Sequence, residues 1–284
     1  MSDSVFEYSG FSIPVNLVEM TGGGPETFDA ISRNHIDCLR VYIGLWEGMS
    51  VLEIGCGIGR DAIPLTEIIG PNGTYVGTDV IEPSIAWCQA NISSRHPNFS
   101  FEWHDIYDDL HNPAGKILAE DVRIPCADES IDIVILQSVF THMYEHEIRH
   151  YMKEFQRVLK QDGKVWASVF VVDKGLLDAV RETAPTIHAL AFKYPYGDGC
   201  YINSLGSPRG AVAFTRAAFD RMVKYAKLEL IREPLVGAWS GTREKAEFGQ
   251  DVLLLRNAGT IEPATLLQPD ASEVANIGSG LAAE

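Results

Sequence analysis

The sequence has few cysteines and no long hydrophobic run, and both absences exclude classes of protein. Its 284 residues contain five cysteines, placed singly at Cys38, Cys56, Cys88, Cys126 and Cys200 without a C-x-x-C pair. An odd, scattered set without a secretory leader is typical of a reduced protein, so we expect a cytoplasmic location and no disulfide framework. No apolar stretch approaches the roughly 20 residues of a membrane span, so no membrane partner is expected.

Positive charge is also scarce in this chain. It carries 23 Lys and Arg against 39 Asp and Glu, a formal net charge of −16 at pH 7. Such a surface repels a phosphate backbone, which argues against nucleic acid as a partner. Hydrophobic residues make up 46% of the chain, enough for a sizeable buried core. We therefore expect a globular protein that acts on a small molecule, and a homodimer is left open.

Predicted strands and helices alternate from residue 25 to residue 172. The apolar runs "MSVLEIG", "GTYVGTDV" and "IDIVILQSVF" are typical of buried strands, and amphipathic segments such as "EHEIRHYMKEFQRVLK" separate them. This alternation predicts an α/β fold with a mainly parallel sheet that helices cover on both faces.

Residues 51–62, "VLEIGCGIGRDA", place three glycines at alternate positions directly after an apolar strand. Gly55, Gly57 and Gly59 let a ligand approach the backbone, and the helix that follows offers unpaired N–H groups. Asp79 ends the next predicted strand, 22 residues beyond Gly57, where a carboxylate can accept hydrogen bonds from ribose hydroxyls. The pattern predicts a nucleoside site; the alternative is a tight turn without a ligand.

Glu53 discriminates between two nucleoside ligands. Residues 57–62 also fit the dinucleotide fingerprint G-x-G-x-x-A, but a dinucleotide brings a doubly negative pyrophosphate to this turn, which Glu53 would repel. S-adenosylmethionine carries an ammonium and a sulfonium instead, so a carboxylate beside the glycines suits its methionine end. The alternative for Glu53 is a surface salt bridge, which its place inside "VLEIG" disfavours.

The motif Glu53-x-Gly55-x-Gly57-x-Gly59 resembles the first motif of class I S-adenosylmethionine-dependent methyltransferases. The likeness extends over residues 21–172 through Asp79, "WHDI", "IPCADESIDIVILQSVFTHM" and "EFQRVLKQDGKV". It implies a Rossmann-like, mainly parallel seven-stranded sheet with helices on both faces and an antiparallel last strand. It also implies S-adenosylmethionine as the cofactor.

The resemblance implies a role for each matching residue around the cofactor. The three glycines would line it, Glu53 would lie near its amino group, and Asp79 would bind the ribose. Asp105 would contact the adenine amine, with Asp121 as a rival because a long irregular stretch follows Asp105. The remaining implied contacts are with the adenine faces and the cofactor backbone, from Val80, Ile81, Ile106, Gln137 and Ser138.

The resemblance also divides the chain into five predicted segments. Residues 25–172 would form the cofactor-binding core, which residues 214–257 complete. Residues 173–213 break the strand–helix rhythm and are predicted to be a loop-rich, substrate-binding insertion. Residues 1–24 end in the glycine run "MTGGG" and are predicted to be a flexible lid, the alternative being a leader without a role. Residues 258–284 lack periodicity and are predicted to be a disordered tail.

His142 is the candidate catalytic base. Methyl transfer mainly requires positioning of the acceptor and exclusion of water, and a base is needed only if the acceptor loses a proton. His142 directly follows the strand "VILQSVF", at the sheet edge where ligands bind; the alternative is a histidine that shapes the loop through the backbone. His146 and His150 follow at helical spacing, but the intervening charges predict a solvated helix face, so no metal is expected.

Aromatic residues of the predicted insertion are candidates for binding the acceptor. Tyr194, Tyr196 and Tyr201 suit a flat or apolar small molecule, and Tyr107 flanks the predicted adenine acid. We therefore expect S-adenosylmethionine-dependent methyl transfer to a small organic acceptor, with oxygen as the favoured atom. Two alternatives are kept: a nicotinamide-dependent oxidoreductase, and a non-catalytic module that binds S-adenosylmethionine.

Overall fold

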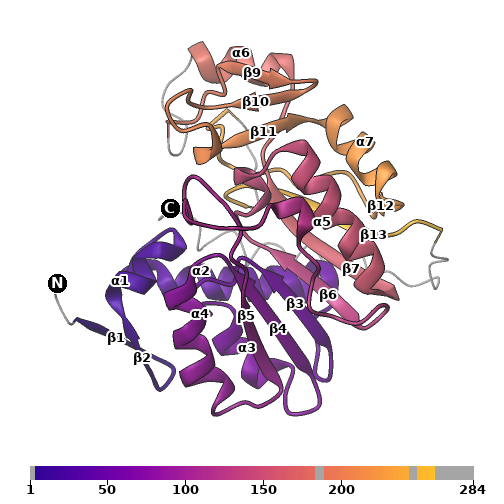
Figure 1. The fold of residues 1–284 in the computed structure, drawn as a ribbon. Coiled ribbons are helices and arrows are strands. Elements are labelled where there is room, and N and C mark those ends of the chain that lie inside the picture. Colours follow the sequence, from indigo (N-terminus) through magenta and orange to yellow (C-terminus); the bar gives the residue numbers. More distant parts are fainter. Residues whose placement is uncertain (1–3, 183–188, 243–247, 260–284) are drawn as a thin grey trace. The chain divides into compact units, whose positions relative to one another are not determined.

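The computed structural model describes residues 4–182, 189–242 and 248–259 (Figure 1). The described chain divides into two compact units. The first takes in the chain up to Asp105 together with Ile131–Ile133, and the second takes in Ile106–Ser130 and the chain from Val134 onward.

The first unit begins with a hairpin, in a segment predicted to be flexible. Strands β1 (Val5–Tyr8) and β2 (Phe11–Pro14) pair antiparallel around Ser9 and Gly10, which both have positive φ, as a tight two-residue hairpin loop requires. The tyrosine of β1 packs edge-on against Phe28, with the ring centroids 5.1 Å apart. The elements that follow are α1 (Val15–Val18), η1 (Glu19–Thr21), α2 (Pro25–Cys38) and η2 (Leu39–Ile43).

The parallel strands of the first unit carry the glycine loop. Glu53 lies opposite Gly77, and Gly77 lies opposite Phe101, in parallel register. A Cβ atom at Gly77 would come within 2.9 Å of the Cys56, Tyr75 and Phe101 side chains, so only glycine fits between these strands. The elements are β3 (Ser50–Ile54), α3 (Ala62–Ile68), β4 (Thr74–Asp79), α4 (Glu82–Cys88), η3 (Gln89–Ser93) and β5 (Phe99–Trp103).

A seven-stranded sheet runs in the order β12-β13-β7-β6-β3-β4-β5, and β6 (Ile131–Leu136) belongs to both units. The last strand of the chain, β13 (Asp251–Asn257), pairs antiparallel with β7 (Leu159–Val169). The predicted Rossmann-like fold, with its mainly parallel sheet and antiparallel last strand, is therefore confirmed. The other elements here are η4 (Ala119–Asp121), η5 (Phe140–His142), α5 (Glu145–Val158), α7 (Arg216–Tyr225) and β12 (Leu228–Leu230).

The predicted loop-rich insertion contains regular structure. After α6 (Lys174–Glu182), the chain forms a second, four-stranded sheet in the order β8-β11-β10-β9. The sequence pattern did not predict these strands, because they have two to four residues each and β9 is exposed along its whole length. The elements are β8 (Val171–Val172), β9 (Tyr194–Gly197), β10 (Cys200–Ile202), η7 (Pro208–Gly210) and β11 (Val212–Thr215).

A separate hydrophobic core supports this second sheet. Phe170, Phe192 and Trp239 form a triangle in which each pair of ring centroids is 5.3 Å apart. Trp239 is thus a core residue, only 1% exposed, and its indole Nε1 donates to Asp251 Oδ2 at 2.9 Å. The predicted disordered tail lies outside the described residues, apart from Ala258 and Gly259.

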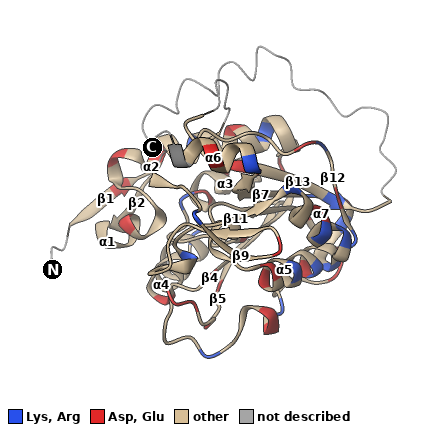
Figure 2. Ribbon diagram, turned by 90° about the horizontal axis from the view of Figure 1, so that it is seen from above, with Lys and Arg blue, Asp and Glu red and all other residues tan. Residues whose placement is uncertain are grey.

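Charged residues of both signs lie along α5 and α7 (Figure 2). Arg216 pairs with Asp220 on α7, and Arg157 pairs with Glu154 on α5. Among the described helices, none combines the length and the apolar character needed to cross a membrane.

Replacing Asp251 with alanine should strongly destabilise the protein. The buried carboxylate accepts hydrogen bonds from the backbone N–H groups of Val171 and Gly237 and from the Trp239 indole. Without it, buried donors lose their acceptor, so we expect the free energy of unfolding to fall by about 3–5 kcal/mol in chemical denaturation. Asp198→Ala, at an exposed carboxylate, is the control and should cost at most about 0.5 kcal/mol. Equal effects of the two variants would contradict this role.

Candidate functional site

The glycine loop of the first unit has a backbone that only glycine adopts without strain. Gly55, Gly57 and Gly59 have φ values of +75°, +52° and +80°. A Cβ atom at Gly57 would come within 2.8 Å of the Thr21 methyl group, and one at Gly59 would come within 2.7 Å of Ile92. The loop therefore packs closely against η1 on one side and η3 on the other.

Asp79 holds the glycine loop in place. Its Oδ2 accepts a hydrogen bond from the Gly57 backbone at 2.7 Å, and its Oδ1 accepts one from the Ile81 backbone at 2.8 Å. The same carboxylate thus connects the loop after β3 with the loop after β4. The side chain is 8% exposed, at the end of β4.

Glu53 is buried within β3 and is 3% exposed. The Tyr75 hydroxyl donates to its Oε2 at 2.5 Å. Burial, with the nearby charge of Asp61, raises the pKa of the Glu53 carboxyl to about 8, although the Tyr75 hydroxyl and Arg60 act in the opposite direction. Glu53 therefore holds a proton at neutral pH, and a cation placed beside it would favour the release of that proton.

Arg60 and Asp61 follow the last glycine of the loop. Burial acts to raise the pKa of Asp61, but the neighbouring His35, 2.7 Å away, and Arg60 outweigh it, so this pKa lies below its usual value. Arg60 Nη1 donates to the Thr21 carbonyl at 3.1 Å, while the Arg60 carbonyl accepts from the Ser32 hydroxyl at 3.0 Å. These contacts join the glycine loop to η1 and α2.

The remaining first-unit residues predicted to bind the cofactor follow the ends of β4 and β5. Val80 accepts a hydrogen bond from the Trp103 indole at 3.0 Å, and Ile81 is the residue before α4. Asp105 is partly buried, two residues after β5. His104 beside it is buried, and its backbone N–H donates to Asp79 at 2.9 Å. Burial lowers the pKa of His104, so its ring is neutral.

The second unit begins with a compact turn at residues 106–117. Ile106 is buried and bridges Ile117, whereas Tyr107 is 45% exposed. Asn112 donates from its side chain to the Ile106 carbonyl at 3.0 Å, which closes the turn. Asp121, the alternative to Asp105 for the predicted contact with the adenine amine, lies exposed in η4.

Gln137 and Ser138 follow β6 directly. Ser138 has a φ of +56°, a left-handed conformation that costs a non-glycine residue energy and is common at functional sites. Its N–H donates to the Ser168 hydroxyl at 2.7 Å, and Gln250 donates to its hydroxyl at 2.9 Å. Within the described chain, the buried Gln137 Nε2 has no hydrogen-bond acceptor, so a donor remains available here.

His142 ends η5 and has a defined tautomer. Its Nδ1 lies 2.8 Å from the Arg209 carbonyl oxygen, which can only accept, so Nδ1 carries the proton. Burial, with the nearby His111, lowers the pKa of His142 despite its bond to Arg209. The ring is therefore neutral at pH 7, and Nε2 presents a lone pair.

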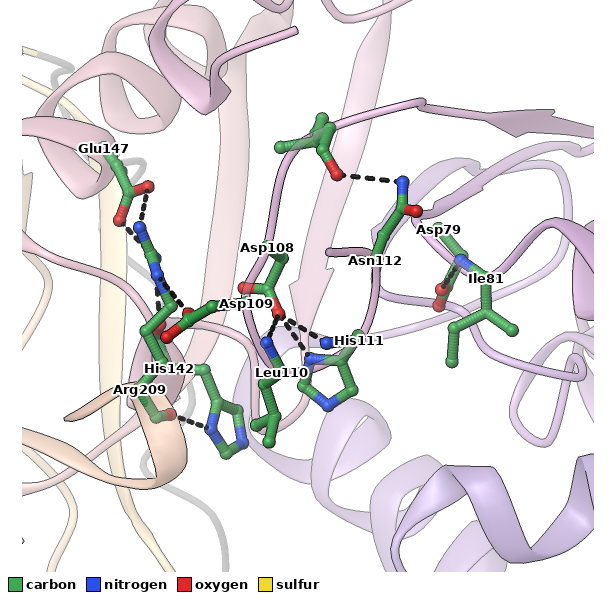
Figure 3. A network of polar contacts seen from close by, with 11 residues as sticks. Asp79, Ile81, Asp108, Asp109, Leu110, His111, Asn112, His142, Glu147 and Arg209 are labelled. Atoms are coloured by element: carbon green, nitrogen blue, oxygen red, sulfur yellow. Dashed lines mark hydrogen bonds and ion pairs between the residues drawn. The ribbon is translucent and has the colours of Figure 1, made fainter. Parts of the chain in front are cut away.

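His111 lies beside His142. The two ring centroids are 5.6 Å apart and the rings meet edge to face at 79°. Asp108 fixes His111: its Oδ1 accepts from the His111 backbone N–H at 2.7 Å and lies 3.1 Å from Nδ1 of the ring (Figure 3). Burial alone would raise the pKa of Asp108, but these bonds to His111 lower it, so the carboxylate is ionised.

Arg209 holds the other side of His142 (Figure 3). Its guanidinium forms two hydrogen bonds with Glu147, at 2.8 and 2.9 Å, and a third contact at 2.9 Å with Asp109. It also lies over the Tyr144 ring, 4.4 Å from the centroid. Because the side chain is fixed at several points, its carbonyl is a rigid acceptor for the His142 Nδ1 proton.

The tyrosines of the predicted insertion have different surroundings. Tyr196 is 50% exposed and stacks on Tyr144, with the centroids 4.9 Å apart. Tyr194 is exposed on the same strand, whereas Tyr201 packs against the hydrophobic core of the second sheet.

Of the three histidines that suggested a metal site, only His146 and His150 lie on the same helix, α5. His142 lies in η5, before α5 begins, and His150 Nε2 donates to the Val122 carbonyl at 2.6 Å. His146 approaches Glu120 and Glu147 closely enough to be considered a ligand group. Both oxygens of Glu147 accept hydrogen bonds from Arg209, so Glu147 already forms an ion pair.

Comparison with known proteins places the chain in a family. A family profile described as "Methyltransferase domain" matches residues 45–227. The arsenite methyltransferase of Aquipseudomonas alcaligenes is 25% identical over 156 residues, which cover 54% of this chain and 41% of that protein. Nocamycin O-methyltransferase of Saccharothrix syringae is 27% identical over 193 residues, which cover 61% of each chain.

A solved structure with a similar fold is the 1,6-didemethyltoxoflavin-N1-methyltransferase of Burkholderia thailandensis with 1,6-didemethyltoxoflavin and S-adenosylhomocysteine bound. It superposes with a TM-score of 0.50 at 17% identity and covers 82% of this chain and 80% of that one. The profile match covers more than half of the 284 residues, so this chain belongs to the class I S-adenosylmethionine-dependent methyltransferases. The predicted family, enzyme class and cofactor are thus confirmed. The chain spans 41% and 61% of the length of the two curated relatives.

The described residues fit S-adenosylmethionine. Glu53 is a buried carboxyl that a cation would ionise, and the Asp79 carboxylate lies at the end of β4, next to the glycine loop. The buried Nε of Arg60 and the buried Nε2 of Gln137 have no hydrogen-bond acceptor within the described residues. When bound, this cofactor supplies a methyl group on a positively charged sulfur.

The sequence analysis did not identify Asp108, His111 and Arg209 as site residues. Asp108 and His111 lie in "YDDLHNPAG", whose turn residues and acids predicted an irregular stretch and nothing more. An aspartate followed by His and Asn-Pro is a turn signal that could have predicted a fixed loop. Arg209 has no such signal, because 67 residues separate it from His142.

Glu53→Gln should raise stability at alkaline pH and weaken cofactor binding. Because the folded-state pKa of about 8 exceeds the ordinary 4.5, the unfolded chain releases this proton first, and stability falls as pH rises between these values. Denaturant unfolding at pH 8 should show the variant more stable by roughly 2–4 kcal/mol, with little difference at pH 4.5. Calorimetry should show at least about tenfold weaker binding of S-adenosylmethionine. A pH-independent stability difference would refute the raised pKa.

Proposed function

We propose that this chain transfers the methyl group of S-adenosylmethionine to an oxygen atom of a small organic acceptor. The main support for this proposal is the tautomer of His142. Its Nδ1–H donates to the Arg209 carbonyl, and Nε2 keeps its lone pair. In this proposal Glu53, the glycine loop and Asp79 bind the cofactor, and the residues around His142 bind the acceptor.

His142 acts as the general base. As the acceptor hydroxyl oxygen forms its bond to the methyl carbon, the hydroxyl proton passes to His142 Nε2. The lowered pKa keeps the ring neutral at physiological pH, and the carbonyl of Arg209 stabilises the imidazolium that forms. An amine acceptor that is already deprotonated has no need of such a base, so a fixed neutral histidine favours oxygen.

Tyr144 and Tyr196 are the proposed surface for an aromatic acceptor. The two rings stack at 4.9 Å, and half of the Tyr196 surface is exposed, so an apolar ring can extend the stack. Tyr107 and Tyr194 are exposed and are proposed to contribute further apolar contacts. Tyr201 is less suited to contact the acceptor, because its ring packs against the hydrophobic core of the second sheet.

Arsenite as the acceptor and a non-catalytic binding role both have less support. One relative is an arsenite methyltransferase, but arsenic(III) is a soft ion that prefers cysteine thiolates. In this chain burial raises the pKa of Cys56 and Cys88, and the single candidate ligand group among the described residues contains no cysteine. A non-catalytic module has no use for a fixed basic histidine.

We further propose that the protein acts in the cytoplasm. All five cysteines carry thiols rather than disulfides, and four of them are buried. Thiols of this kind persist in a reducing compartment. The homodimer that the sequence left open is not part of this proposal.

Methyl transfer to a panel of phenols, catechols and aromatic amines, followed by release of S-adenosylhomocysteine, tests the function. We expect turnover with hydroxyl acceptors, and His142→Asn should reduce kcat by about 10²–10⁴ without changing cofactor affinity. The rate should rise with pH through a value below 6.5 and then stay level, since only neutral His142 can accept the proton. His146→Asn, 60% exposed, is the matched control and should be fully active. Equal losses in both variants, or turnover only with amines, would overturn the proposal.

Residues 1–24 are proposed to act as a lid on the cofactor. In the described part, the Thr21 methyl group packs against Gly57 and the Thr21 carbonyl binds Arg60, so this segment contacts the glycine loop directly. Deleting residues 1–24 should weaken S-adenosylmethionine binding about tenfold or more in calorimetry, with thermal unfolding as a check that the truncated chain is folded. Unchanged affinity in a folded truncation would rule out the lid.

A further inference from the structure

Apolar side chains are exposed on the compact turn of the second unit. The four that are between 41% and 51% exposed, called the apolar patch below, are Tyr107, Leu110, Ile117 and Leu118. Tyr107 donates from its backbone N–H to the Ile117 carbonyl at 2.8 Å, so the two ends of this segment lie side by side. Exposed apolar side chains that gather on one surface segment mark a place where another molecule binds.

The turn that carries the apolar patch has a fixed backbone. Asp108 Oδ1 accepts from the Leu110 backbone N–H at 2.9 Å, and the backbones of Asp108 and Asn112 exchange hydrogen bonds at 3.1 and 2.9 Å. A Cβ atom at Gly115 would come within 2.2 Å of the Ile106 carbonyl oxygen, so only glycine allows this close approach. The turn therefore holds its apolar side chains in place, as a preformed binding surface does.

The apolar patch borders the proposed base. His111 follows Leu110, and its ring meets the ring of His142 with the centroids 5.6 Å apart. In Figure 3 the Leu110 side chain points to the same side as these two rings. An acceptor that reacts at His142 Nε2 can therefore reach Leu110 with a chain that it carries.

Arg209 connects this turn to the pair of tyrosines proposed to hold an aromatic acceptor. Its guanidinium contacts Asp109 of the turn at 2.9 Å and lies 4.4 Å from the centroid of the Tyr144 ring, while its carbonyl accepts from His142. Tyr144 in turn stacks on Tyr196. The base, the aromatic surface and the turn with the apolar patch are thus joined through one residue, which suits an acceptor with both a ring and a chain.

We propose that the apolar patch binds a hydrophobic chain carried by the hydroxyl-bearing ring of the acceptor. This rests on the proposed function and narrows its substrate class to alkylated phenols and similar amphiphiles. The ring lies against Tyr196, and the chain lies over Leu110 and Leu118, where contact removes apolar surface of both molecules from water. The acids Asp108 and Asp109 in the same turn disfavour an anionic lipid surface as the occupant.

Two series of phenols, with unbranched chains of one to six carbons at position 3 or at position 4, test the proposal. Release of S-adenosylhomocysteine gives kcat/KM for each compound. This value should rise about two- to fourfold with each added CH₂ group in at least one series, since full burial of a CH₂ group contributes about fourfold.

The matching change in the protein is the double variant Leu110→Ser/Leu118→Ser. It should lower the ratio of kcat/KM for the pentyl compound to kcat/KM for the methyl compound by about fivefold or more, because the chain loses its apolar contacts. A general loss of activity or stability would lower both values equally and leave the ratio unchanged.

Leu205→Ser is the matched control. Leu205 is a leucine of the second unit that is 66% exposed and lies outside the turn. Its replacement should leave the dependence on chain length unchanged, and thermal unfolding checks that each variant is folded.

Four outcomes would overturn the assignment. If kcat/KM of the wild-type protein does not change with chain length in either series, the patch holds no chain; this result decides even if the double variant does not fold. If the double variant keeps the wild-type dependence, the chain binds elsewhere. If the wild-type values are flat and the double variant loses cosedimentation with phosphatidylcholine vesicles, or loses self-association, the occupant is a bilayer or a second copy of this chain. If no phenol is methylated, the proposed function fails together with this inference, whereas the other outcomes leave that function intact.

Discussion

The two backbone hydrogen bonds of Asp79 are the contact on which the first unit depends. One carboxylate joins Gly57, in the loop after β3, to Ile81, in the loop after β4. The loop needs this support because three glycines with positive φ have no side chains to hold it. A loop built from glycine is thus held in place by an aspartate of the neighbouring strand.

Burial and nearby charges together determine which ionisable groups of the site are charged at neutral pH. Glu53 and Asp61 are both buried in the first unit. Burial and the nearby charge of Asp61 raise the pKa of Glu53, so it holds its proton, whereas Asp61 is ionised beside His35. In the second unit, burial keeps His142 neutral while the Arg209 carbonyl selects its tautomer. A carboxyl that keeps its proton and a histidine that stays neutral therefore arise from the same physical effect, desolvation.

The predictable parts of the structure were those with local sequence signals. Buried parallel strands leave continuous apolar runs, and the glycines and Asp79 follow such runs directly, so this half of the site could be located from sequence. The short strands of the second sheet have no such pattern, and β9 is wholly exposed. Arg209 and His142 are brought together only by the tertiary fold, so no local rule could predict that His142 would be held by this carbonyl.

The central claim is that the glycine loop holds S-adenosylmethionine rather than a dinucleotide. Parallel calorimetric titrations of the whole chain with S-adenosylmethionine and with NADH test it most directly. We predict micromolar binding of S-adenosylmethionine and no detectable binding of NADH, because the acid at Glu53 suits an ammonium and opposes a pyrophosphate. Binding of NADH without S-adenosylmethionine would contradict the account of Glu53 and of the loop it supports.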